Sequence, residues 1–121
     1  MIPMPISVAN ADHYRWGDGC DGWHLMRAAG VSVIEERMPP RSAEVRHWHA
    51  RAIQFFYVMS GTLVMEVEGA RHELSKGTGI ELPSGTAHQA RNEGSIDATF
   101  LVISSPPHQG DRREAMLEDT V

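Results

Sequence analysis

Two histidines stand two positions apart in the stretch RHWHARAIQFFYVMSG, which covers residues 46–61. Alternate side chains of a β-strand point to the same side, so His47 and His49 can reach one cation together. Gln54 follows in an apolar run, and a hairpin would bring it back beside the two imidazoles. A buried amide needs a partner, and a metal ion is one. The alternative is a pair of structural histidines and a polar residue at a sheet surface.

A third imidazole, His88, lies in the stretch PSGTAHQARN, after a turn that Pro83 and Gly85 predict. Taken alone, this histidine is more typical of a surface position next to a turn than of a metal ligand. Whether His88 is a metal ligand therefore depends on the strands that surround it.

The elements that would position these side chains are short strands separated by turns. Turn residues recur at the spacing typical of an all-β sandwich or barrel. The sequence contains no βαβ alternation, which excludes a nucleotide-binding α/β fold. We expect strands in residues 31–37, 44–49, 53–59, 62–68, 69–75 and 96–104, with two short strands within 77–92.

The two ends of the chain differ from this pattern. Residues 1–30 are predicted to form a glycine-rich arm whose tryptophans, Trp16 and Trp23, pack on the barrel or on a second copy. The barrel is expected to cover residues 31–105. In the tail, residues 106–121, the sequence GDRREAMLEDTV predicts a short helix with Asp111 as its N-cap.

Composition limits the classes of function. A chain of 121 residues fits one domain. Its net charge of −5 does not favour binding to nucleic acid or to anionic membranes. Cys20 is the only cysteine, so an intrachain disulfide is impossible. The N-terminal residues lack the basic region and the long apolar region that a signal peptide contains. We therefore expect a cytoplasmic protein without nucleic-acid or membrane partners.

Two spaced motifs resemble those of the cupin superfamily. The run from Gly77 through Pro83, Gly85 and His88 to Asn92 is similar to the second cupin motif, G-x5-P-x-G-x2-H-x3-N, at every fixed position.

The first cupin motif, G-x5-H-x-H-x4-E-x6-G, resembles the run His47, His49, Gln54 and Gly61 with two departures. Arg41 stands where the leading glycine belongs, and Gln54 replaces the glutamate. The first departure affects a turn, whereas the second changes a residue at a position that binds the metal in this family.

The resemblance covers residues 31–104 and is to small single-domain bacterial cupins. It implies a double-stranded β-helix, or jelly roll, that holds one divalent metal, usually in a homodimer. The family's ligand positions fall on His47, His49, Gln54 and His88. The implied cofactor is a divalent transition metal such as Zn, Mn, Fe or Ni.

A neutral ligand set leaves the charge of the cation uncompensated and favours the divalent state. We therefore expect a Lewis-acid enzyme that binds a small oxygen-rich molecule such as a sugar acid, a dicarbonyl or a polyketide-like compound. Its reaction would be of the isomerase, lyase or dioxygenase type. The alternative is a metal-dependent binding or sensing module without turnover.

The sequence predicts no acid or base for such an enzyme, so its catalytic residues are unknown. Strand parity places Glu44 and Arg46 on the face opposite the histidines, and Glu66 opposite the apolar face of its strand. Similar cupins that open unsaturated uronates carry an acidic residue on the last strand. Here that stretch has Val102 and no carboxylate, which disfavours this activity.

Overall fold

The fold is built from β-strands. The computed structural model describes residues 2–107 and 110–115, and no helix occurs in these ranges. None of the described residues therefore lies in a helix that could cross a membrane. The all-β prediction is confirmed. The strands are β1 (Asp12–Trp16), β2 (Cys20–Arg27), β3 (Ser32–Met38), β4 (Ser42–Ala43), β5 (His47–His49), β6 (Ile53–Ser60), β7 (Leu63–Val67), β8 (Ala70–Leu74), β9 (Gly79–Leu82), β10 (His88–Asn92), β11 (Ala98–Ser105) and β12 (Arg112–Glu114).

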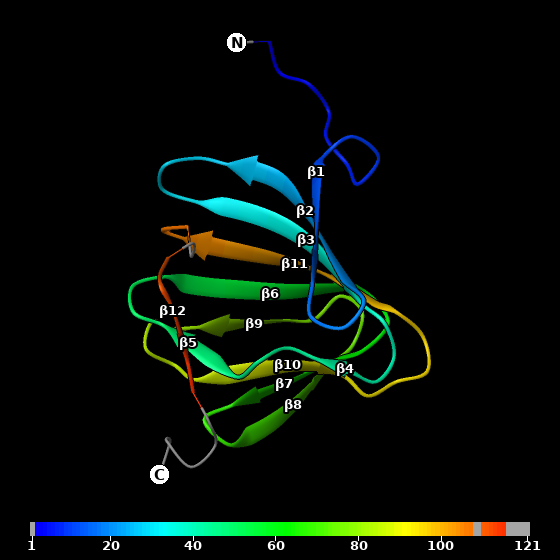
Figure 1. Ribbon diagram of the computed structural model, residues 1–121, viewed down its shortest axis with the longest axis vertical. Coiled ribbons are helices and arrows are strands. Elements are labelled where there is room, and N and C mark those ends of the chain that lie inside the picture. Colours follow the sequence, from blue (N-terminus) through cyan, green and yellow to red (C-terminus); the bar gives the residue numbers. More distant parts are fainter. Residues whose placement is uncertain (1, 108–109, 116–121) are drawn as a thin grey trace.

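These strands form two antiparallel sheets (Figure 1). The first has the order β1-β2-β3-β11-β6-β9, and the second has the order β12-β5-β10-β7-β8, with β4 also paired to β10. Both sheets include neighbours that are distant in the sequence, such as β3 and β11 in the first and β5 and β10 in the second, as the double-stranded β-helix requires. The jelly-roll prediction is confirmed.

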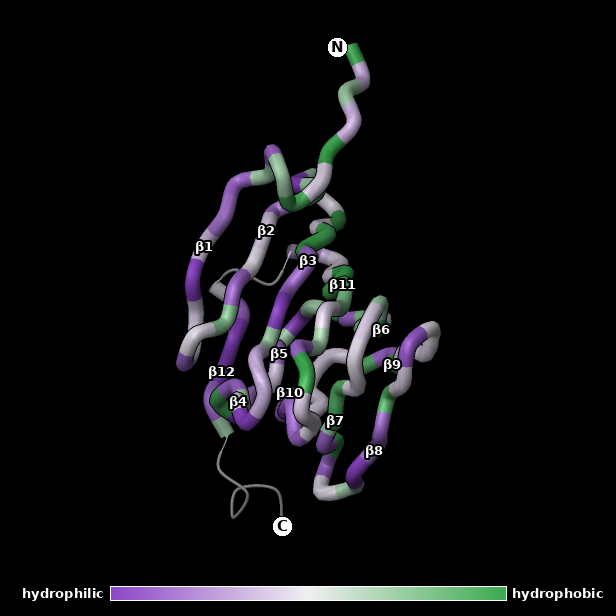
Figure 2. Tube along the Cα trace, turned by 90° about the vertical axis from the view of Figure 1, so that its right-hand side faces the viewer, coloured by the Kyte–Doolittle hydropathy of each residue, from purple (hydrophilic) through white to green (hydrophobic). Residues whose placement is uncertain are grey.

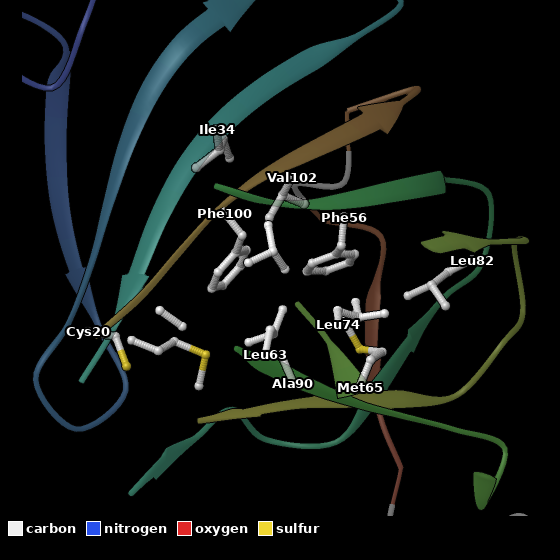
Figure 3. Packing of buried hydrophobic residues seen from close by; sticks show 13 residues of the cluster. Cys20, Ile34, Phe56, Leu63, Met65, Leu74, Leu82, Ala90, Phe100 and Val102 are labelled. Atoms are coloured by element: carbon white, nitrogen blue, oxygen red, sulfur yellow. The ribbon is translucent and has the colours of Figure 1, made fainter. Parts of the chain in front are cut away.

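The core lies between the two sheets, where alternate side chains of each strand point inward. Along β11, buried and half-buried residues alternate from Ala98 to Ser104. Phe56 and Phe100 meet here with ring centroids 5.9 Å apart, and Leu63 and Met65 of the other sheet are fully buried with them (Figure 3). This packing fixes which face of each strand points into the barrel.

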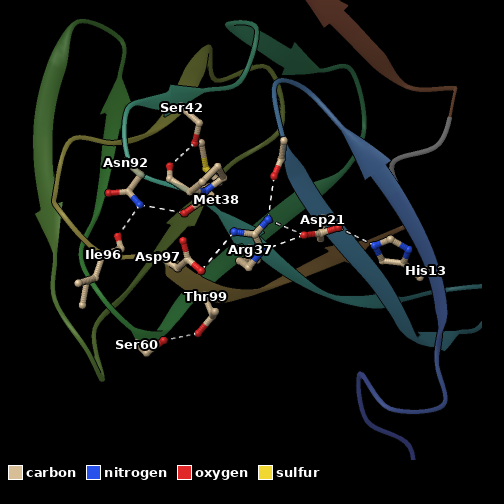
Figure 4. Close-up of polar contacts among 12 residues, drawn as sticks. His13, Asp21, Arg37, Met38, Ser42, Ser60, Asn92, Ile96, Asp97 and Thr99 are labelled. Carbon is tan, nitrogen blue, oxygen red and sulfur yellow. Dashed lines mark hydrogen bonds and ion pairs between the residues drawn. The ribbon is translucent and has the colours of Figure 1, made fainter.

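The head of the chain is more regular than the arm that we expected. Its strands β1 and β2 form a hairpin, and β2 pairs with β3, so the hairpin extends the first sheet. Asp21 joins the hairpin to the barrel: its carboxylate accepts a hydrogen bond from Arg37 Nε at 2.8 Å and lies 2.7 Å from His13 Nε2 (Figure 4). Trp16 packs against the core.

The tail prediction was wrong where the structure describes it. Residues 112–114 form β12, which pairs with β5 instead of forming a helix. The Asp111 carboxylate accepts hydrogen bonds from the backbone amides of Arg51 and Ala52, at 2.9 and 2.8 Å, so it caps the β5–β6 turn and not a helix. The rest of the predicted helix, residues 116–121, lies outside the described residues.

Asn92 ties the ends of several strands together, and its removal is expected to destabilise the fold. It is 1% exposed, and its Nδ2 donates to the carbonyls of Met38 and Ile96 at 2.8 and 2.9 Å. Asn92→Ala should lower the free energy of unfolding by about 2–4 kcal/mol, because each buried group left without a partner costs about 1–3 kcal/mol. Urea denaturation measures this change.

Ser75→Ala is the matched control, since this exposed hydroxyl makes only a 3.4 Å contact with Thr78. It should change stability by no more than about 0.5 kcal/mol. Equal stability of the two variants would show that Asn92 does not hold these strands.

Candidate metal site

Three buried histidines converge inside the barrel. His47 and His49 come from β5 and His88 comes from β10, where it pairs directly with His47. The three side chains are 4%, 3% and 1% exposed. One ligand nitrogen from each lies within 4.8 Å of the others, which is close enough to hold one ion. The structure thus brings together the three histidines singled out in the sequence.

Backbone carbonyls orient two of these rings. Nδ1 of His47 lies 2.8 Å from the Val45 carbonyl, and Nδ1 of His88 lies 2.9 Å from the Thr86 carbonyl. A carbonyl oxygen only accepts, so each Nδ1 carries the proton and each Nε2 keeps its lone pair. Nε2 of His88 is buried and has no hydrogen-bond partner among the described residues.

Burial keeps the imidazoles of His47 and His88 neutral. Burial, followed by the nearby His88 ring, lowers the pKa of His47 to about 2. Burial also lowers the pKa of His88. Neutral rings present lone pairs, which is the form that a metal ion binds.

Gln54 presents an amide oxygen to the same cavity. It lies on β6 and is 3% exposed, and its Nε2 donates to Ser104 Oγ on the adjacent β11 at 3.0 Å. That hydrogen bond fixes the orientation of the amide. Its Oε1 is buried without a hydrogen-bond partner in the described part of the chain. Three imidazole nitrogens and one amide oxygen form a neutral donor set that fits a divalent transition metal.

The cavity beside these residues has a volume of about 140 Å³. Its apolar wall includes Phe56 and Val102, and its polar wall carries groups that the sequence analysis missed. Phe100, the neighbour of Phe56 in the core, is fully buried and does not line the cavity.

Tyr14 and Glu36 form the first of these groups. The Tyr14 hydroxyl on β1 donates to Glu36 Oε2 on β3 at 2.8 Å, although β2 lies between the two strands. The residue between them is Gly22, where an added Cβ would lie 2.1 Å from the Tyr14 ring. The tyrosine therefore reaches the glutamate only because Gly22 has no side chain.

This contact changes the acidity of both groups. Burial raises the pKa of Glu36 to about 7 and outweighs the hydrogen bond from Tyr14, which lowers it. Burial and the charge of Glu36 raise the pKa of Tyr14 above its ordinary value. A carboxyl group with a pKa near neutrality can exchange protons at physiological pH.

Glu44 corrects the sequence analysis, which expected no carboxylate on the histidine side. It lines the cavity, its Oε1 lies 3.9 Å from His47 Nδ1, and its Oε2 accepts a hydrogen bond from the Ala90 amide at 2.8 Å. Burial raises its pKa to about 8. Strand parity failed because residues 44–46 are irregular backbone between β4 and β5, and Val45 is consequently 53% exposed.

Arg112 completes the polar wall from β12. It lines the cavity, and its Nη2 donates to the Val45 carbonyl at 3.0 Å. Its charge lowers the pKa values of Glu36 and Glu44, although burial raises them more. The cavity thus combines two carboxyl groups, a phenol and a guanidinium beside the three imidazoles.

Comparisons with known proteins agree with this architecture. A family model described as a cupin domain matches residues 34–104, more than half of the chain. The uncharacterized protein MJ1618 of Methanocaldococcus jannaschii is 27% identical over 93 residues, which cover 77% of this chain and 74% of that protein.

Two solved structures illustrate the similarity of fold. KdgF from Halomonas sp. has a TM-score of 0.80 and 21% identity, with 88% of this chain and 96% of that chain covered. The polyketide cyclase RemF from Streptomyces resistomycificus has a TM-score of 0.82 and 18% identity, with 98% and 90% covered. At these identities the likeness concerns the fold alone.

The position of Tyr14 can be tested by titration. In a Tyr57→Phe background Tyr14 is the sole tyrosine, and its phenol should ionise above the ordinary pKa of 10.0 because burial raises its pKa. Adding Gly22→Ala should displace the ring from the cavity and return its pKa toward 10.0. Phenolate absorbance measures the titration, and circular dichroism reports whether the fold persists.

Gly30→Ala is the control, since an added Cβ there meets nothing within 4 Å. Identical titration curves for the two alanine variants would mean that Gly22 does not hold Tyr14 in place.

Proposed function

The chain belongs to the cupin family, and we propose that His47, His49, Gln54 and His88 together hold one divalent transition metal. One observation carries this proposal: three buried imidazoles offer ligand nitrogens within 4.8 Å of one another. Gln54 Oε1 and His88 Nε2 support it, because they are buried without hydrogen-bond partners among the described residues. A bound cation would satisfy both groups. Zn, Mn, Fe and Ni all accept this donor set.

We further propose that the protein is an enzyme that moves a proton on a small oxygen-rich molecule. When bound, the metal supplies a Lewis acid that polarises a substrate oxygen. Glu36 takes or returns the proton on a neighbouring carbon or oxygen, and Tyr14 holds its carboxyl group in place. Arg112 binds an anionic group of the substrate.

These groups favour particular substrates and reactions. A guanidinium suits a carboxylate or an enolate, and a Lewis acid suits a carbonyl oxygen, so sugar acids, dicarbonyls and polyketide-like compounds fit the site. Isomerases and lyases need a proton-transferring group, which Glu36 supplies, so this chemistry is favoured over dioxygenation. Among the proteins of similar fold, RemF is named a polyketide cyclase.

The remaining expectations from the sequence concern location and partners. The single cysteine and the acidic net charge of −5 support a cytoplasmic protein without nucleic-acid or membrane partners. These stay predictions.

Metal content tests the ligand set. Elemental analysis of the purified wild type should find about one metal ion per chain. The metal content of His88→Ala should be about one tenth of that value or lower, because one ligand is lost. Ser104→Ala should weaken metal affinity by about 10–100-fold, because it removes the hydroxyl that orients Gln54. His72→Ala on the exposed face of β8 is the control and should keep the metal. Equal metal content in the His88 and His72 variants would show that the histidine cluster is not the site.

Proton transfer tests the assignment of Glu36. Metal-loaded protein is incubated in D₂O with unsaturated uronates, dicarbonyl compounds and flavonols, and proton NMR follows conversion and deuterium uptake beside the carbonyl. Glu36→Gln should slow the reaction by about 10²–10⁴-fold, because the amide cannot take up the proton. The metal content should remain that of the wild type.

Glu73→Gln is the control, because Glu73 is exposed on β8 away from the cavity. An undiminished rate in Glu36→Gln would remove this residue from the mechanism. Binding of a compound without conversion or exchange would favour the alternative of a binding module.

A further inference from the structure

A second cavity lies in the first sheet, near the turn that joins β2 to β3. It has a volume of about 460 Å³, and its described lining consists of His24, Arg27, Ala28, Ser32 and Pro107. Figure 2 shows β2 and β3 next to β1, at one edge of this sheet. None of these five residues lines the metal cavity. The volume is large enough for a molecule of the size of a sugar.

A β-bulge turns two side chains of β2 toward this cavity. The pairing of β2 with β3 shifts between His24 and Met26, and Leu25 is the extra residue. In a regular strand, residues three positions apart point to opposite faces, so His24 and Arg27 would not share one. The bulge changes this direction, and both side chains line the cavity.

Two buried polar atoms of the cavity lack hydrogen-bond partners. Ser32 is 2% exposed, and its Oγ forms no hydrogen bond with the described residues. Nδ1 of His24 is also buried, and it has no partner in the described part of the chain. Burial of such atoms is unfavourable unless another group binds them. A ligand with oxygen atoms at these positions would satisfy both.

Arg27 gives the cavity a positive charge. Its Nη1 lies 2.9 Å from Asp12 Oδ2, and a guanidinium has five N–H donors, so this contact leaves donors for a ligand. Burial, followed by the charge of Arg27, lowers the pKa of His24, so this ring is neutral at physiological pH. No carboxyl group is among the described lining residues. The cavity therefore suits an oxyanion.

Buried side chains separate this cavity from the histidine cluster. Ser32 pairs with Ser104 on β11, and Ser104 pairs with Gln54 on β6. Two strand spacings, about 10 Å, therefore lie between Ser32 and Gln54. Ser104, the residue between them, is fully buried. A ligand in the second cavity thus does not need the metal.

We propose that this cavity is a second ligand site, which binds a small hydroxylated acid through its carboxylate or phosphate group. The guanidinium of Arg27 binds the oxyanion, while Ser32 Oγ and His24 Nδ1 form hydrogen bonds with other oxygen atoms of the molecule. One cationic group and two neutral polar groups match a molecule with one anionic group and several hydroxyls. Sugar acids and sugar phosphates have this chemistry.

Calorimetric titration tests the site. The full chain is titrated with D-glucuronate, with glucose 6-phosphate and with uncharged glucose. At least one of the two anions should bind with a Kd of about 1 mM or lower. Glucose should bind about tenfold more weakly or not at all, because it has no charge for Arg27 to bind. The anion with the higher affinity distinguishes a carboxylate site from a phosphate site.

Substitution of Arg27 identifies the group that binds the anion. Arg27→Gln should weaken binding of the better anion by about tenfold or more, because charge-assisted hydrogen bonds are lost. Arg71→Gln is the matched control, since Arg71 is exposed on β8 and pairs with Glu93 at 2.7 Å. It should bind as the wild type does. Equal affinity of the two variants, or no binding of either anion to the wild type, would overturn the second site without affecting the metal proposal.

Ser32→Ala separates a role in binding from a role in the fold. Because Ser32 Oγ has no partner among the described residues, its removal should not lower the melting temperature. It should weaken anion binding by about 3–10-fold, because one hydrogen bond to the ligand is lost. Unchanged affinity together with a lower melting temperature would show that this hydroxyl serves the fold and not a ligand.

NMR spectroscopy locates the bound anion. The ring signals of His24 should shift when the anion is added, whereas those of His72, which is exposed on β8, should stay in place. Shifts confined to His47, His49 and His88 would place the anion in the metal cavity and would refute the second site.

Discussion

The pairing of β10 with β5 is the constraint on which the site depends. This pairing sets His88 directly opposite His47, and a shift of one residue would turn one of the two imidazoles to the outside of the barrel. The carbonyls of Val45 and Thr86 then select which nitrogen of each ring keeps its lone pair. The convergence of three histidines is thus a property of backbone register first and of side-chain choice second.

The groups around the cavity differ in the charge that they can carry. Gln54 is neutral and burial keeps His47 and His88 neutral, whereas Glu36, Glu44 and Arg112, which also line the cavity, are ionisable. A cation held by neutral ligands would keep its full charge, so its field would act on the nearby carboxyl groups instead of being cancelled in direct contact. In the proposed site, the neutral ligands would hold the ion and the carboxyl groups would exchange protons.

The parts of this structure that follow local patterns were predictable from the sequence. Strand alternation and turn residues predicted the barrel, and the resemblance to the two cupin motifs predicted the cluster of His47, His49 and His88, because both depend on neighbouring residues and on a recurrent motif. Glu44 was missed because parity holds only within a regular strand, and the backbone at residues 44–46 is irregular.

Tyr14 and Arg112 were missed for a different reason. Tyr14 reaches the cavity across β2 of its own hairpin, whereas Arg112 enters through the pairing of β12 with β5, which is far away in the sequence. The sequence predicted a turn-rich arm for the first and a helix for the second, since neither segment contains an uninterrupted alternating run. Gly22, a glycine inside a strand, is a signal that could have indicated the close approach of Tyr14.

The hydrogen bond between Gln54 and Ser104 has an evolutionary consequence. A serine hydroxyl accepts from the Gln54 amide and could equally donate to a carboxylate, so a glutamate at this position would find the same partner. Glutamine and glutamate codons differ by one nucleotide. The net charge of the ligand set is therefore one mutation away from a different value, with no change in the surrounding strands. During evolution, proteins with this barrel could change between neutral and anionic ligand sets, and so between types of reaction. A single substitution is enough, so no intermediate variant that fails to fold is needed.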